Sequence, residues 1–359
     1  MASDGKPSRC DKARLSLSPQ FWHPNVVHNE KQFPREVEVA DVTPGNGEMP
    51  RALPVWQPPK PRPQRLWLAV LLFAVTFLTC LAAGRQFAIS FANGQAASFD
   101  EFFVSLKLLY KDPTALAPGF PFALALMTIL LAHELGHYFA CRHHGIRATY
   151  PYFIPAPTLI GTLGAFILMR SPIRSRQALF DVGASGPLVG FAVAIPVLLY
   201  GAAHSRAAPE ILSPQATVVF GVPLAIRLMD RAFFPGTNPA AILLHPVARA
   251  AWVGLFATSL NLLPAGQLDG GHILRSLSPR LHKWVGWLVP LLLIGLGYFY
   301  ASVWMMWATI LIALRFLRIP PVYDERPLDW GRVALAVAAL LVMILCFMPV
   351  PLWEPGSAQ

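Results

Sequence analysis

Two histidines and a glutamate lie close together at residues 133–137, where the sequence reads His-Glu-Leu-Gly-His. Side chains four residues apart lie on one face of a helix, so His133 and His137 can both reach the same metal ion. Glu134 follows the first histidine and can point at a water molecule bound to that metal. The spacing therefore predicts a zinc-dependent hydrolase in which Glu134 is the general base.

A catalytic zinc normally takes a third ligand from the protein and leaves its fourth position to water. The best candidate is Asp269, in the segment 261–272 that reads Asn-Leu-Leu-Pro-Ala-Gly-Gln-Leu-Asp-Gly-Gly-His. Proline and glycine interrupt the helix there and let a carboxylate turn inward. His272 and Asp181 are rival third ligands, and a helix cap or a solvated loop carboxylate is the alternative role for Asp269.

The chain around these residues is strongly apolar. Of its 359 residues, 55% are hydrophobic and 13% are charged, whereas a soluble protein carries about 25% charged residues. A polytopic membrane protein is therefore the first interpretation. A chance His-Glu-x-x-His on a solvated helix face is disfavoured, because the apolar run before the motif places it within a membrane span, where such residues are costly and usually functional.

Seven apolar segments have about the length that a helix needs to cross a bilayer. They are residues 66–83, 119–141, 185–203, 247–264, 284–300, 302–317 and 333–349. The segment 213–226 is apolar but short, and we predict a re-entrant or interfacial piece there. Residues 151–170 are apolar yet broken by proline and glycine, which favours a β-strand or hairpin. The predicted fold is an all-α polytopic membrane protein of about seven transmembrane helices, with a small membrane-embedded β element near the active site.

Three regions follow from this pattern. Residues 1–64 are polar and proline-rich and are predicted to be a disordered cytoplasmic segment, 65–350 a membrane domain, and 351–359 a short tail. Arginine and lysine gather in the loops 142–184 and 265–283, and the positive-inside rule places these loops and the N-terminus in the cytoplasm. The two motifs then lie at the same cytoplasmic depth. We expect a multi-pass protein of a bacterial inner membrane.

Charge and cysteine content exclude other classes. The net charge is +10, but the basic residues lie between apolar runs, so the charge reflects topology and we expect no nucleic-acid partner. The four cysteines are far apart and form no Cys-x-x-Cys pair, which argues against a cysteine zinc site or a disulfide framework. The sequence indicates no oligomeric state.

Together, the two motifs resemble those of the site-2 protease family of intramembrane metalloproteases. His-Glu-Leu-Gly-His lies in one span, and Asn-x-x-Pro-x-x-x-Leu-Asp-Gly ends a later one. The segments 161–166, 180–190 and 245–246 resemble bacterial and plastid members that lack an inserted PDZ domain. The resemblance covers about residues 118–282.

The resemblance implies a role for each matching residue. His133, His137 and Asp269 would bind one catalytic zinc, and Glu134 would activate the water. Asn261 would help to bind or polarise the substrate peptide. The partners would be the lipid bilayer and a transmembrane protein substrate.

The segment from Gly161 to Phe166, with Gly164 in it, resembles the strand element of the family that would pair with an unwound substrate. A transmembrane helix hides its peptide bonds and must unwind before cleavage, and a strand edge can hold the extended form. The alternative is that the two glycines merely form a tight turn. Gly186 and Gly190 are spaced for close helix packing rather than chemistry.

Two other functions compete with proteolysis. Histidine and aspartate inside a helix bundle can mark the ion path of a membrane metal transporter, although a transporter has no obvious need for Glu134 beside its ligand. A catalytically silent relative that binds membrane proteins is the third possibility, and the intact motifs argue against it.

Overall fold

The computed structural model describes residues 65–95, 99–208, 219–238, 241–316, 324 and 326–353. The chain divides into two compact units, Met1–Arg62 and Pro63–Gln359, and the description below concerns the second. The predicted polar segment 1–64 lies outside the described residues.

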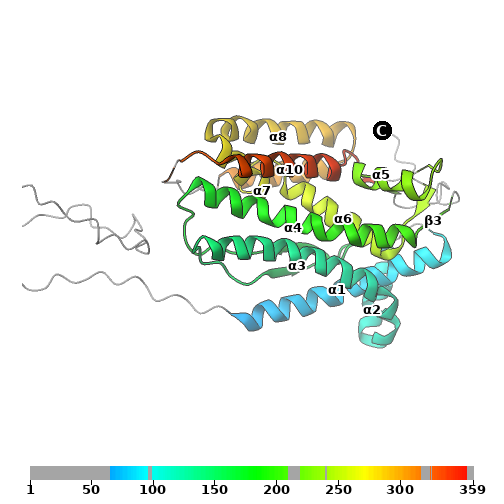
Figure 1. Ribbon diagram of the computed structural model, residues 1–359. Coiled ribbons are helices and arrows are strands. Elements are labelled where there is room, and N and C mark those ends of the chain that lie inside the picture. The colour runs from blue at the N-terminus through cyan, green and yellow to red at the C-terminus, as the bar shows by residue number, and fades with distance from the viewer. Residues whose placement is uncertain are drawn as a thin grey trace, which may run out of the picture. The chain divides into compact units, whose positions relative to one another are not determined.

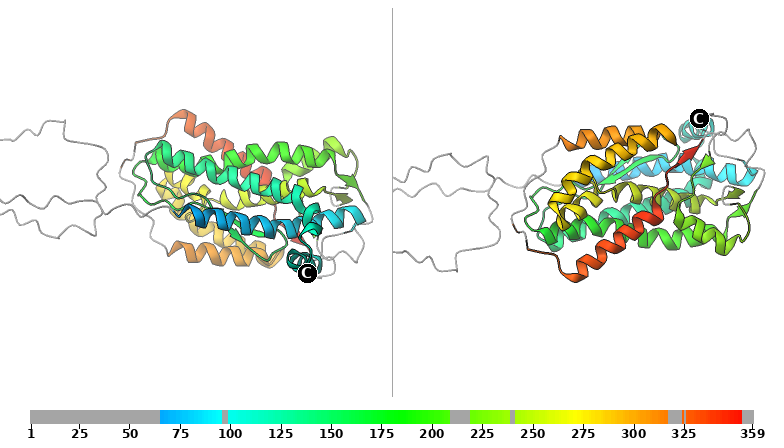
Figure 2. Two further views of the ribbon diagram at one scale, coloured as in Figure 1. Left: turned by 90° about the horizontal axis from the view of Figure 1, so that it is seen from below. Right: turned by 90° about the horizontal axis from the view of Figure 1, so that it is seen from above.

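The described part of the chain is mostly helical (Figures 1 and 2), which confirms the predicted helical class. The helices are α1 (Leu66–Asn93), α2 (Phe99–Lys111), the 3-10 helix η3 (Pro113–Gly119), α3 (Phe120–His143), α4 (Arg176–Ala203), α5 (Leu224–Phe233), α6 (Pro246–Asn261), α7 (Asp269–Leu277), α8 (Pro279–Phe299), α9 (Val303–Arg315) and α10 (Trp330–Cys346). The strands are β1 (Tyr152–Pro155), β2 (Thr162–Phe166), β3 (Arg206–Ala207), β4 (Val219–Phe220), β5 (Ile242–Leu243) and β6 (Leu352–Trp353).

Each of the seven predicted spans contains a helix, but the count of seven spans is not confirmed. Within the described ranges, four helices are long and apolar enough to cross a membrane: Leu66–Asn93, Pro113–His143, Arg176–Ala203 and Pro279–Phe299. Helices α9 and α10 are apolar but shorter, and α6 has 16 residues. A straight crossing needs about 20 residues, so these three fall short of that length.

Helix α1 runs to Asn93, well beyond the predicted end at residue 83. Arg85 and Gln86 interrupt the apolar run without interrupting the helix, because their side chains are accommodated inside the protein. Gln86 is fully buried, and Arg85 donates to the Ala115 carbonyl. The helix ends where Gly94 adopts a left-handed conformation with φ of 69°, a frequent helix C-terminus.

Helix α4 lies at the centre of the bundle and packs against α3, α6 and α7. Small residues let these backbones approach closely, as is common between membrane helices. A Cβ added to Gly201 of α4 would lie 2.2 Å from the Ala248 nitrogen of α6. A Cβ added to Gly84 of α1 would lie 2.3 Å from the carbonyl oxygen of Gly119, the last residue of η3.

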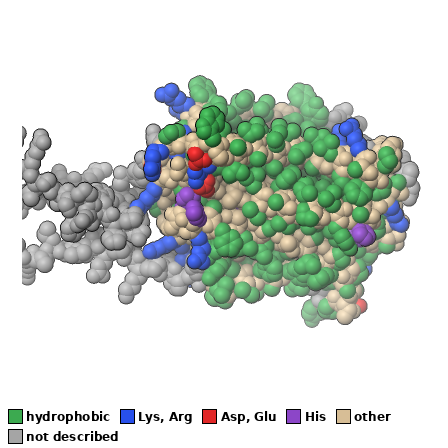
Figure 3. Space-filling view, in the orientation of Figure 1, with side chains coloured by type: hydrophobic (Ala, Val, Ile, Leu, Met, Phe, Trp, Pro, Cys, Tyr) green, Lys and Arg blue, Asp and Glu red, His purple; other side chains and the backbone are tan. Residues whose placement is uncertain are grey.

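The outer surface suits a lipid environment. Figure 3 shows hydrophobic side chains over the middle of the helical unit, with lysine and arginine near two opposite ends of the helices. Large apolar side chains are exposed on α8 and α10, among them Trp284 at 77%, Leu291 at 63% and Leu341 at 56%. Exposed apolar patches of this extent are rare on soluble monomers. The chain is a membrane protein.

Strands β1 and β2 form an antiparallel hairpin in which Phe153 lies opposite Ala165. The predicted hairpin within residues 151–170 is therefore confirmed. Its turn contains Gly161, with φ of 80°, and the Thr79 hydroxyl of α1 donates a 2.6 Å hydrogen bond to the Gly161 carbonyl. Helix α1 thus holds the tip of the hairpin in place.

The predicted interfacial piece 213–226 is described from residue 219 onward. Strand β4 pairs with β6 near the end of the chain, with Phe220 opposite Leu352, and Leu224 begins the short helix α5. Re-entry into the membrane stays a prediction. The predicted tail 351–359 is described as far as residue 353 and contributes strand β6.

The close approach of α1 to η3 gives a first prediction. Gly84→Ala should destabilise the protein by about 1–3 kcal/mol, the usual cost of forcing extra atoms into a packed interior. Thermal unfolding in detergent measures the effect. Gly295→Ala on α8 is the control, since its added methyl group meets no atom within 4 Å. Equal melting temperatures for the two variants would contradict the packing described here.

Candidate metal centre

Two helices supply the candidate metal ligands. His133 and His137 lie four residues apart on the buried face of α3, as their spacing predicted. Asp269 is the first residue of α7 and follows an irregular segment that begins where α6 ends. That segment turns at Gly266, which has φ of 58°, and the turn carries the carboxylate back toward α3.

Three ligand atoms form an almost equilateral triangle. The Nε2 atoms of His133 and His137 are 3.2 Å apart, and each lies 3.2 Å from Oδ2 of Asp269. Among the described residues, this is the group of histidine, cysteine and acidic side chains arranged to hold a metal ion. The rival ligands His272 and Asp181 are not part of it.

The donor set fits zinc. Zinc bonds to histidine nitrogen and carboxylate oxygen are about 2.0–2.2 Å long, so tetrahedral ligand atoms lie about 3.3 Å apart, close to the observed triangle. Two imidazoles and one carboxylate are also ligands that zinc accepts, and three protein ligands leave a fourth position for water or substrate. His133, His137 and Asp269 are therefore the residues that would hold the metal.

A carbonyl of α4 orients one imidazole. Nδ1 of His137 lies 2.6 Å from the Val182 carbonyl oxygen. A carbonyl oxygen can only accept a hydrogen bond, so Nδ1 must carry the proton. In the neutral ring Nε2 then keeps its lone pair toward the triangle, which is the form that binds a metal.

Glu134 is buried beside the triangle, with 5% of its surface exposed. Its carboxylate lies next to the backbone N–H of Ile167, the residue that follows strand β2. The candidate general base thus lies between the ligands and the hairpin.

Asn261 reaches the same centre from the last turn of α6. Its Nδ2 atom lies 3.2 Å from Nε2 of His133. The amide is therefore in contact with one of the candidate metal ligands.

Two glycines of α4 make room for the imidazoles. A Cβ added to Gly186 would lie 2.1 Å from Nε2 of His137, and one added to Gly190 would lie 3.1 Å from Nδ1 of His133. The pair was expected to serve helix packing. The structure adds that the packing partners are the candidate ligands themselves.

The two glycines of the hairpin differ in their surroundings. A Cβ added to Gly161 would lie 2.6 Å from the Thr79 carbonyl oxygen, whereas one added to Gly164 would meet nothing within 4 Å. Gly161 therefore has a structural role in the turn against α1. Gly164, with φ of 100°, faces open space.

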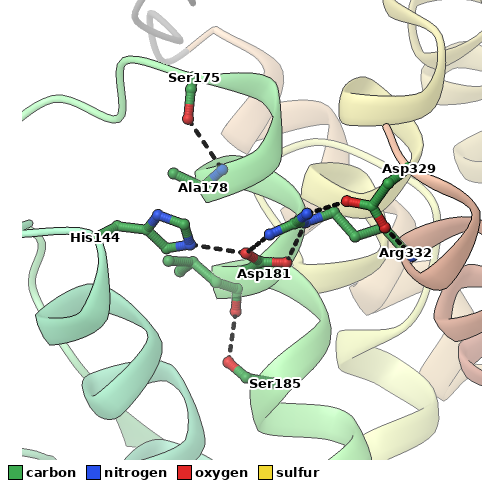
Figure 4. Close-up of polar contacts among 8 residues, drawn as sticks. His144, Ser175, Ala178, Asp181, Ser185, Asp329 and Arg332 are labelled. Atoms are coloured by element: carbon green, nitrogen blue, oxygen red, sulfur yellow. Dashed lines mark hydrogen bonds and ion pairs between the residues drawn. The ribbon is translucent and has the colours of Figure 1, made fainter. Parts of the chain in front are cut away.

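Sequence reasoning missed a polar cluster at the end of α3. Asp181 contacts His144 and Arg332 there (Figure 4). Nothing in the sequence marks this group, because Arg332 is 151 positions from Asp181. The cluster also explains why Asp181 is not a third ligand: its carboxylate oxygens already accept hydrogen bonds from His144 and Arg332.

Comparison with known proteins identifies relatives of this chain. Residues 121–286 match peptidase family M50. The chain is 28% identical over 317 residues to a probable zinc metalloprotease EGY1, chloroplastic, of Oryza sativa subsp. japonica, a match that covers 82% of this chain and 52% of the relative. The EGY1 protein of Arabidopsis thaliana is 27% identical, with 82% and 55% covered. The chain thus spans about half the length of these curated relatives. No solved structure matches significantly.

The contact between Gly186 and His137 gives a second prediction. Gly186→Ala should push the imidazole out of the triangle and weaken zinc binding about 10- to 100-fold, the usual effect of disturbing the support of a metal ligand. Competition with a chelating dye measures the affinity. Gly190→Ala should have a smaller effect, because its contact distance is longer, and Gly295→Ala should have none. A Gly186→Ala protein with normal zinc affinity would contradict the geometry.

Proposed function

Because the chain belongs to peptidase family M50, the site-2 protease family, we propose that it is an intramembrane zinc metalloprotease. It hydrolyses peptide bonds within or near the transmembrane segments of other membrane proteins. His133, His137 and Asp269 hold one zinc ion, and Glu134 is the catalytic base.

One observation supports this proposal most strongly. The three candidate ligand atoms lie 3.2 Å from one another, and a buried glutamate adjoins them on a helix apolar enough to span a membrane. Burying four ionisable groups in an apolar bundle costs free energy. Such residues within a membrane are therefore usually functional. A hydrolytic metal centre needs all four.

The residues divide the work of hydrolysis. When bound, zinc supplies Lewis-acid chemistry, since it lowers the pKa of water and polarises a carbonyl. Glu134 takes a proton from the attacking water as the water oxygen bonds to the carbonyl carbon. The same carboxyl then gives the proton to the amide nitrogen as the carbon–nitrogen bond breaks. Asn261 binds the substrate carbonyl beside His133.

The hairpin is the proposed substrate-binding element. Strand β2 leads directly to Ile167 next to Glu134, so a peptide paired with this strand would run past the base. Pairing by β-addition uses backbone hydrogen bonds and suits substrates of varied sequence. Gly164 is better placed for this contact than Gly161, because an added Cβ at Gly164 meets no atom within 4 Å, whereas Gly161 packs against the backbone of α1.

Orientation is part of the proposal. The basic loops favour a cytoplasmic N-terminus and a cytoplasmic active-site side. The curated relatives are named as chloroplastic proteins, and the match gives no support for the expected bacterial inner membrane. The proposed partners are therefore a lipid bilayer and a transmembrane substrate, without a named compartment.

The base gives a third prediction. Glu134→Gln should keep one bound zinc and lower the cleavage rate about 10²- to 10⁴-fold, the usual contribution of a general base. Cleavage of a fluorogenic transmembrane peptide in liposomes, together with metal analysis, measures both. Asp112→Asn, which neutralises an exposed carboxylate at the start of η3, should cleave normally.

The same liposomes separate the competing functions. A Glu134→Gln protein that cleaves at the wild-type rate would refute the protease assignment. Zinc uptake into dye-loaded vesicles would indicate a transporter instead. A wild-type protein that binds the peptide and zinc without cleavage or uptake would indicate a silent relative.

The third ligand gives a fourth prediction. Asp269→Asn should purify with substoichiometric zinc, because two neutral imidazoles bind the ion much more weakly than two imidazoles and a carboxylate. Elemental analysis of the purified protein measures the content. His272→Asn, which removes the rival ligand on the same helix, should retain its zinc. The opposite pattern would exchange the two assignments.

A further inference from the structure

The polar cluster at the end of α3 centres on the Asp181 carboxylate (Figure 4). Its Oδ2 atom accepts hydrogen bonds from Nε2 of His144 at 2.7 Å and from Nη2 of Arg332 at 2.6 Å. Its Oδ1 atom accepts from Nε of Arg332 at 2.8 Å. Arg332 therefore forms a bidentate ion pair with Asp181 through two parallel hydrogen bonds, a strong and directional arrangement.

The three residues belong to three different parts of the bundle. His144 directly follows α3, the helix that carries two candidate ligands. Asp181 lies in the second turn of α4, and Arg332 in the first turn of α10. The side chains are largely shielded, with 19–23% of their surfaces exposed, so bulk water screens their attraction only in part.

The cluster adjoins the support of the metal centre. Asp181 is followed by Val182, whose carbonyl accepts the hydrogen bond from His137. The Ser185 hydroxyl donates to the same carbonyl. A shift of this turn of α4 away from α3 would lengthen the contact between the Val182 carbonyl and His137, and the Asp181–His144 hydrogen bond opposes such a shift.

We propose that Asp181 is a positioning residue: with His144 and Arg332 it fixes the α4 turn that orients His137, and it couples α10 to the metal site. Arg332 lies outside residues 121–286, which match family M50. Helix α10 thus supports the metal site through the ion pair between Arg332 and Asp181. This inference rests on the proposed zinc site and deepens it.

The chain offers a matched control in the same cluster. Asp329 also pairs with Arg332, through Nη1, and accepts a 3.0 Å hydrogen bond from the Arg332 backbone N–H. These contacts hold the pKa of the Asp329 carboxyl below its ordinary value. Asp329 is more exposed, at 52%, and within the described residues its side chain pairs with Arg332 of α10 rather than with α3 or α4. Removing its charge should therefore disturb α10 and spare the contact of Asp181 with His144.

The test compares Asp181→Asn, Arg332→Gln and the double variant in the full-length, zinc-loaded protein. Each single variant should release zinc to a chelator about threefold to tenfold faster than wild type, somewhat less than the effect of losing a direct partner of a metal ligand. The double variant should match Asp181→Asn, because that single change already removes the ion pair that Arg332→Gln removes. Arg332→Lys, which keeps the charge but loses the two-pronged geometry, should lie between Arg332→Gln and wild type. Asp329→Asn should stay within about twofold of wild type.

Several results would overturn the proposal. Wild-type zinc release in Asp181→Asn would do so, as would equal effects of Asp181→Asn and Asp329→Asn, which would indicate general loosening of α10. Multiplied effects in the double variant would show that the two residues act separately. If Asp181→Asn fails to fold, Arg332→Gln and Arg332→Lys test the same contact from α10. A wild-type protein that binds no zinc would refute the proposed function itself. If the wild type binds zinc and is active, but the variants release zinc at the wild-type rate, only this inference is refuted.

Discussion

The structure depends on holding two imidazoles and a carboxylate within 3.2 Å of one another inside an apolar helix bundle. Each group loses its hydration when it is buried, and the loss must be offset by specific partners. The four-residue spacing on α3 places His133 beside His137, and the irregular segment after α6 brings Asp269 to them. The Val182 carbonyl of α4 orients His137. The rest of the bundle keeps these three elements in register.

The helices that carry the candidate ligands hold their relative positions because their backbones approach closely. Helices α3 and α4 approach closely at Gly136, where an added Cβ would lie 2.7 Å from the Ser185 carbonyl oxygen and 3.1 Å from Cα of Gly186. Gly186 and Gly190 then receive the imidazoles of the facing helix. Dispersion and tight packing dominate association in an apolar solvent, so the glycines that bring the helices together are also those that shape the metal centre.

The hairpin and the polar cluster are two further supports of this centre. The hairpin is fixed to α1 through Thr79 and reaches Glu134 through Ile167. The cluster fixes α3 to α4 and α10 through Asp181. One support is formed largely by backbone, and the other by polar and charged side chains.

The sequence by itself determined the helical class, the hairpin and the likeness to a family of metalloproteases, because helix periodicity, apolar runs and ligand spacing are local properties. It also brought Asp269 forward as the partner of His133 and His137, since both motifs end apolar segments. The length of α1, the contact of Gly186 with His137 and the pairing of Asp181 with Arg332 emerged from the folded arrangement alone. Those features join residues remote in the chain through packing, and no local pattern records which distant side chain a fold will bring into contact.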